Sequence, residues 1–240
     1  MVSGTDTETA QSTAGKKTAA GKWLFVAELE HVIVSSRELL FAAVETALKK
    51  QGASIDPTTF RRYCLKAQPG PIAEALAANM KGASLNVEQL GQAIAESYDQ
   101  ALAKGGAPTN QTFLDLIAAA KNQSIQLAAI TPLGEDLATE ILAKAGLADH
   151  GIRIFSLPES DKWYPRMDAW MKICRTMNRA PQACVALTSS QDPCKSALSA
   201  GMRCLVFPDR YTAHHDFSGA DAVLDPGEDS NLAELLELIL

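Results

Sequence analysis

The fold is decided by residues 23–39, which read WLFVAELEHVIVSSREL. Residues 23–27 form a short apolar run of the kind that makes a buried parallel strand. Two acidic residues, Glu28 and Glu30, follow this run, and a helical pattern begins at Arg37. Because ligands of open parallel sheets bind outside the carboxyl ends of the strands, both glutamates are candidate site residues.

The second half of the chain alternates between short apolar runs and longer helical periods. The apolar runs predict strands at residues 125–130, 152–155, 184–187, 203–207 and 222–224. The helical periods predict helices at residues 134–145, 165–177, 193–200 and 231–239. This alternation predicts an α/β fold in which a doubly wound, Rossmann-type parallel sheet carries helices on both faces.

Between the first two predicted strands the pattern is helical only. Helices are expected at residues 37–50, 57–67, 71–79 and 87–104. We therefore expect an all-helical cap at residues 37–105, inserted into an α/β core of residues 22–36 and 106–240. Residues 1–21 are rich in Ser, Thr, Ala, Gly and Lys, and this composition predicts a disordered leader.

Composition argues against two classes of partner. The formal net charge is -6 and the basic residues are scattered, which argues against nucleic-acid binding. No apolar run reaches the roughly 18 residues that a membrane span needs. The five cysteines include no CxxC pair, although Cys174, Cys184, Cys194 and Cys204 recur every ten residues. We expect these cysteines to pack in the core of a protein of the reducing cytoplasm.

Four sequence motifs follow one another along the chain, and the fourth consists of two stretches. Residues 28–36 read ELEHVIVSS, Thr131 ends a predicted strand, and Lys162 precedes a Pro-containing helix start. Residues 184–190 read CVALTSS, and residues 197–202 then read ALSAGM. This order resembles the haloacid dehalogenase-like hydrolases with a helical cap, such as β-phosphoglucomutase and phosphoglycolate phosphatase. The resemblance covers residues 23–240.

The resemblance assigns roles to these positions. It places Glu28, Glu30, Thr131 and Lys162 at the family's catalytic positions. In the family an Asp at the first position attacks phosphorus, and an Asp at the second acts as acid and base. Glu28, Glu30 and Ser189 stand at the family's metal positions, so the resemblance implies Mg²⁺ if the protein is active and no cofactor otherwise.

This sequence departs from the family at the same positions. Each glutamate is one methylene longer than the family's aspartate, which moves the carboxylate by about 1 Å. Thr188 and Ser189 replace an acidic pair, and His31 replaces a glycine at a tight turn. Mg²⁺ requires near-octahedral oxygen ligation, so these changes predict loss of the ion.

Three hypotheses about function follow. The first is a catalytically silent relative, or pseudoenzyme, which binds a protein partner or a small phosphorylated ligand. The second is a divergent Mg²⁺-dependent phosphatase or phosphomutase, with Glu28 as nucleophile, Glu30 as acid and base, and Asp192 reaching the ion. The third is a structural subunit of a larger assembly.

Several residues have plainer interpretations as well. Glu28 and Glu30 are either cleft acids, of which one has a raised pKa, or solvated acids paired with Lys162. His31 is either a functional group or a residue that fills space. His214 and His215 are adjacent, and neighbouring residues seldom converge on one metal ion.

Overall fold

The computed structural model describes residues 22–65, 68–80, 82–120, 125–157, 165–224 and 232–239. The predicted leader and Lys162 lie outside these ranges. The described strands form one parallel sheet in the order β3-β2-β1-β4-β5-β6. Their bounds are β1 Leu24–Glu28, β2 Gln126–Thr131, β3 Arg153–Ser156, β4 Cys184–Thr188, β5 Arg203–Val206 and β6 Ala222–Val223. The α/β class and the parallel sheet are as predicted.

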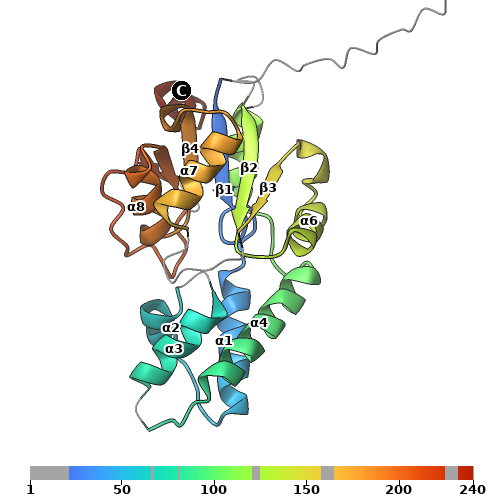
Figure 1. Cartoon of the computed structure of the whole chain (residues 1–240), viewed down its shortest axis with the longest axis vertical. Helices are drawn as coiled ribbons and strands as arrows, with labels where there is room; N and C mark the ends of the chain where they lie inside the picture. The colour runs from blue at the N-terminus through green and yellow to red at the C-terminus, as the bar shows by residue number, and fades with distance from the viewer. Residues whose placement is uncertain are drawn as a thin grey trace, which may run out of the picture.

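The sheet is covered by helices on both faces (Figure 1). The core helices are α5 Gln111–Ala119, α6 Glu135–Lys144, α7 Met167–Thr176, α8 Gln191–Ser199 and α9 Leu232–Ile239. Alternate residues of β1 point to opposite faces, as the period of a strand requires. Leu24 and Val26 share one buried cluster with residues of α7 and α8, whereas Phe25 and Ala27 belong to the cluster on the other face.

The helices that follow β1 form a separate layer below the sheet in Figure 1. They are α1 Arg37–Lys50, α2 Pro57–Tyr63, α3 Pro69–Asn79 and α4 Val87–Ala103, and α4 packs against both α1 and α3. The side chains of Asp56 and Asn86 accept hydrogen bonds from Thr59 N (2.8 Å) and Gln89 N (3.0 Å). These N-caps start α2 and α4 at the predicted residues.

Three details differ from the predicted elements. Helix α5 was not predicted, although the Asn110 side chain caps it by accepting hydrogen bonds from Thr112 N and Phe113 N. Helix α2 ends at Tyr63, four residues before its predicted end. Two short 3-10 helices, Ala148–His150 and Pro181–Ala183, were not predicted either. The other described α-helices and strands start and end within two residues of the predicted bounds.

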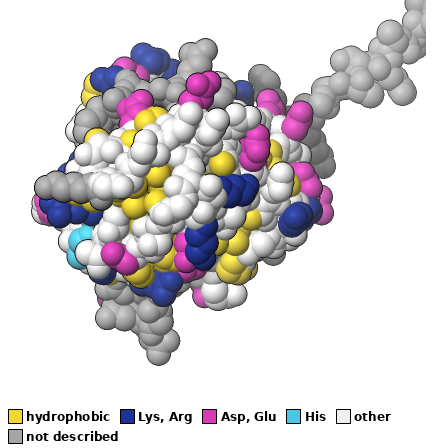
Figure 2. Space-filling view, turned by 90° about the horizontal axis from the view of Figure 1, so that it is seen from below, with side chains coloured by type: hydrophobic (Ala, Val, Ile, Leu, Met, Phe, Trp, Pro, Cys, Tyr) yellow, Lys and Arg dark blue, Asp and Glu magenta, His cyan; other side chains and the backbone are white. Residues whose placement is uncertain are grey.

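Two observations on the described residues concern surface charge and membrane spanning. On the face seen from below, Lys and Arg side chains are interspersed with Asp and Glu side chains (Figure 2). Within the described parts of the chain, every helix is too short or too polar to cross a bilayer.

Candidate functional site

The carboxyl ends of the central strands bring the motif residues together. Glu28 ends β1, Thr131 ends β2, and Ser189 directly follows β4. Because the strands are parallel, these residues meet at one edge of the sheet, which is the edge that faces the cap.

A cavity of about 440 Å³ lies between this edge and the cap. Glu28 and Glu30 both line it, while Leu29 between them is buried. Its other described lining residues come from both layers, and each layer contributes polar and apolar residues. They include His31, Arg37 and Tyr98, and Leu40, Leu65, Ile72 and Ala95.

Glu28 is held by the residue at the family's metal position. Its Oε2 accepts a hydrogen bond from Ser189 N (2.7 Å) and another from Ser189 Oγ (3.0 Å). Burial raises the pKa of Glu28 to about 7, although these hydrogen bonds and the nearby charge of Arg37 act in the opposite direction. The carboxyl at the nucleophile position is therefore partly protonated near neutral pH.

Glu30 is bonded to the residue at the second motif position. Thr131 Oγ donates to Glu30 Oε1 (2.7 Å), and Leu133 N donates to Thr131 Oγ (3.0 Å). Burial raises the pKa of Glu30 to about 7 as well. A hydroxyl has one hydrogen to donate, so the hydrogen of Thr131 is not free for an anion.

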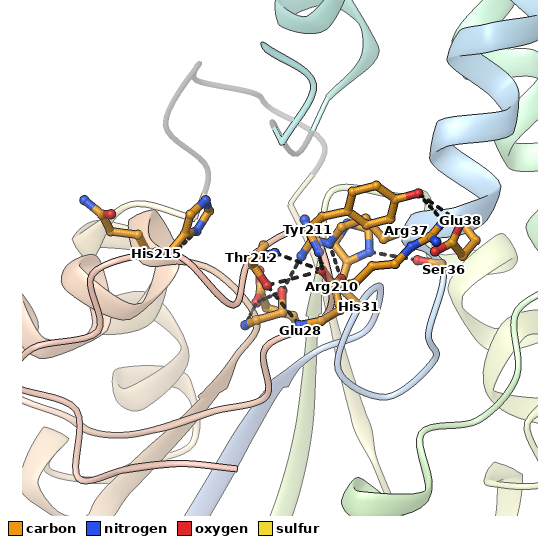
Figure 3. A network of polar contacts seen from close by, with 12 residues as sticks. Glu28, His31, Ser36, Arg37, Glu38, Arg210, Tyr211, Thr212 and His215 are labelled. Carbon is orange, nitrogen blue, oxygen red and sulfur yellow. Dashed lines mark hydrogen bonds and ion pairs between the residues drawn. The ribbon is translucent and has the colours of Figure 1, made fainter. Parts of the chain in front are cut away.

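Arg37 is the central cation of a polar network drawn in Figure 3. Its side chain is 5% exposed, its Nε donates to Asp209 Oδ2 (2.5 Å), and its Nη2 donates to Ser189 Oγ (2.8 Å). Asp209 Oδ1 in turn accepts hydrogen bonds from the backbone N–H groups of Tyr211 and Thr212. No functional role was predicted for Arg37 from the sequence. The signal was a positive charge on the first residue of a helix, where the helix dipole disfavours it.

His31 links the strand end to the cap. It has a left-handed backbone with φ of 77°, at the position where the family has glycine. Ser36 Oγ lies 3.0 Å from His31 Nδ1 and 2.8 Å from the Tyr98 hydroxyl, which belongs to α4. Burial holds the pKa of His31 well below its usual value, so the imidazole is neutral.

The described residues do not fit Mg²⁺, the ion that the family resemblance implies. Ser189 Oγ already donates to Glu28 and accepts from a guanidinium, and that guanidinium would repel a divalent cation. The hydroxyl offers no negative charge where the family has a carboxylate. Among the residues that the structure describes, no group of three or more His, Cys, Asp or Glu side chains is arranged to hold a metal ion.

The other candidates from the sequence are not brought to this cavity. Asp192 is exposed and is not among the lining residues. His215 Nδ1 accepts a hydrogen bond from Gln191 N (3.2 Å), and its ring stacks edge-on to that of His214. The position of Lys162 lies outside the described residues, so its role stays a prediction.

Comparison with known proteins agrees with the fold. Protein CbbY from Cereibacter sphaeroides is 31% identical over 147 residues, which make up 60% of this chain and 64% of CbbY. The crystal structure of CbbY from Rhodobacter sphaeroides in complex with phosphate has a TM-score of 0.71 at 24% identity, covering 88% of this chain and 95% of that one. No protein-family model matches the chain.

A second solved structure gives the same result. β-Phosphoglucomutase from Clostridium difficile has a TM-score of 0.71 at 15% identity, and the match covers 90% of this chain and 96% of that chain. The chain therefore has the fold of these proteins, which include solved structures described as haloacid dehalogenase-like. At the positions where the resemblance implies two aspartates this chain has Glu28 and Glu30, and its residues at the fourth motif are neutral.

Proposed function

We propose that this chain is a catalytically silent member of the haloacid dehalogenase-like superfamily, which acts by binding a small ligand in the cavity between cap and core. The supporting observation is that the groups needed for phosphoryl transfer bond to one another. Glu28 Oε2 accepts two hydrogen bonds from Ser189, and Thr131 donates its hydroxyl hydrogen to Glu30. A nucleophile that is partly protonated and doubly hydrogen-bonded on one oxygen is a poor one.

The charges around the cavity favour a ligand that has no phosphate at the core end. Glu28, Glu30 and Asp99 line the cavity, and Arg37 is the single cation among its described lining residues. Arg37 is already paired with Asp209. A hydroxyl-rich ligand such as a sugar would donate hydrogen bonds to the carboxylates, whereas a phosphate would meet like charge. A small phosphorylated ligand is the alternative outcome.

Thermal-shift titration with xylulose and with xylulose 1,5-bisphosphate tests this proposal. The bisphosphate is chosen because a CbbY mutant from Rhodobacter sphaeroides has been crystallised with it. We expect xylulose to raise the melting temperature and the bisphosphate to have a smaller effect at equal concentration.

Two variants of α4 locate the binding site. Ala95→Phe fills the cavity and should abolish the shift, whereas Gln100→Phe on the exposed side of α4 should keep it. An equal shift in the Ala95→Phe variant, or no shift with either compound in the unmodified protein, would contradict the proposal.

A second candidate function is hydrolysis without a metal ion. It is supported by the two cavity carboxyls, each with a pKa near 7, which is the range that suits a general acid or base at neutral pH. A panel of sugar phosphates and glycosides assayed in EDTA tests it. Turnover that disappears in Glu30→Gln and follows a bell-shaped pH profile would favour this function over silent binding.

A further inference from the structure

A cluster of hydrogen-bonded residues lies at the position where the family resemblance implies Mg²⁺. At the carboxyl ends of β1 and β4 the guanidinium of Arg37 donates to Asp209 and to Ser189 Oγ, and Ser189 Oγ donates to Glu28. This cluster of hydrogen-bonded residues needs a positive charge, since the nearby carboxylates of Glu28 and Asp209 repel one another when no cation is present.

The side chain of Arg37 is buried and is held in place by an ion pair and hydrogen bonds. Arg37 is the first residue of α1, and its side chain is 5% exposed. Burying a guanidinium is costly unless it is paired and hydrogen-bonded. Here its Nε and Nη2 donate to partners that lie 172 and 152 residues away in the sequence. Asp209 is held in place by the backbone N–H groups of Tyr211 and Thr212.

The charges of the cluster also balance. Relative to the family pattern, two negative charges are lost at Thr188 and Ser189, and the loss of a divalent ion removes two positive charges. In this chain Arg37 and Asp209 carry one charge of each sign, and these charges cancel. The net charge of the cluster is therefore the same as with the acidic pair and the metal ion. The positive charge now belongs to a side chain of the protein instead of a bound metal ion.

We propose that Arg37 is a built-in cation that replaces the divalent metal ion at the carboxyl ends of β1 and β4. Its guanidinium contacts Ser189, the residue at the family's metal position, and from there the hydrogen bonds continue to Glu28. The cleft is then preformed without Mg²⁺, whichever ligand it binds. This inference goes beyond the proposed function and does not depend on the identity of that ligand.

Melting curves of three proteins test this inference. They are the unmodified protein, Arg37→Lys, which keeps a positive charge, and Arg37→Gln, which keeps a hydrogen-bond donor without the charge. We expect millimolar Mg²⁺ to raise the melting temperature of Arg37→Gln by roughly 3 °C or more and to leave the other two unchanged. A Mg²⁺ effect in the unmodified protein, or no effect in a folded Arg37→Gln variant, would overturn the inference.

A second variant keeps the test decisive if Arg37→Gln does not fold. Ser189→Asp restores a carboxylate at the metal position while Arg37 remains. The new carboxylate should pair with the guanidinium, so isothermal titration should detect no saturable Mg²⁺ binding. Millimolar or tighter Mg²⁺ binding by Ser189→Asp would show that Arg37 does not occupy the place of the ion.

Discussion

At the scale of single residues, the two acids of the first motif are hydrogen-bonded to other motif residues. Glu28 accepts hydrogen bonds from Ser189, and Glu30 accepts one from Thr131. The alternation about Leu29 left open whether Glu28 and Glu30 are cleft acids or solvated acids paired with Lys162. In the structure both line the cavity, and burial raises the pKa of each to about 7. Their partners were not predictable in the same way. Arg37 and Asp209 are 172 residues apart, and a sequence pattern carries no information about a pair so distant.

Glu30 should make the stability of the protein depend on pH. Its pKa is about 7 in the folded protein and near 4.5 when unfolded, so the folded state binds the proton more tightly. The resulting stabilisation is complete below about pH 4.5 and is lost as the pH rises through about 7. Glu30→Gln should remove this loss and, at about pH 8, raise the free energy of unfolding by roughly 1–3 kcal/mol.

Urea unfolding of both proteins between about pH 5 and pH 8 measures this effect. Glu96→Gln, on the exposed side of α4, is the control and should keep the pH dependence of the unmodified protein. If Glu30→Gln and the unmodified protein lose stability equally with rising pH, the burial of this carboxyl is not the cause.

The left-handed backbone at His31 should decide which residues can replace it without loss of stability. Its φ of 77° lies in the left-handed region, which asparagine enters readily and β-branched residues avoid. Both His31→Asn and His31→Val lose the imidazole, so their difference reports the backbone. We expect His31→Val to be less stable than His31→Asn by about 1–2 kcal/mol in urea unfolding. Equal stabilities would argue that the turn relaxes without strain.

At the scale of elements, the strands were predictable because both of their faces are buried. A parallel strand covered by helices on both sides reads as a continuous apolar run, and β1 and β4 are such runs. The cysteines follow the same logic. Cys174, Cys184, Cys194 and Cys204 lie on α7, β4, α8 and β5, and all four are buried in one cluster, as predicted.

Helix α5 was predictable from the sequence, although it was not predicted. Its signals were present, since Asn110 is a good N-cap and Phe113 and Leu116, three residues apart, are both buried. The end of α2 lacked such a signal, because no glycine or proline follows Tyr63 directly.

The start of α4 should depend on its N-cap. Asn86 Oδ1 accepts the hydrogen bond of Gln89 N, and among the described residues no other side chain accepts from that donor. Asn86→Ala should lower the free energy of unfolding by about 1 kcal/mol, whereas Asn86→Ser should retain most of it. Thermal or urea unfolding of the two variants distinguishes them, and an Asn86→Ser variant as unstable as Asn86→Ala would show that the cap is not the reason.

At the scale of the whole molecule, the cap is attached to the core by the same residues that shape the cleft. Arg37 of α1 reaches Ser189 and Asp209 of the core, and Tyr98 of α4 reaches Ser36 next to the strand end. The layout of cap and sheet was predictable from the order of helical and apolar segments. What binds in the cleft was not, because the cavity is formed by side chains from both layers. Docking to a protein partner and membership of a larger assembly stay predictions.

We propose above all that the motif residues of the cleft are hydrogen-bonded to one another and do not catalyse phosphoryl transfer. The measurement that tests it most directly is phosphate release from p-nitrophenyl phosphate and xylulose 1,5-bisphosphate by the unmodified protein and by Glu28→Gln, each with millimolar Mg²⁺ and with EDTA. We predict equal rates for both proteins, at the level of the protein-free control under both conditions. Mg²⁺-dependent release by the unmodified protein that Glu28→Gln abolishes would contradict the claim.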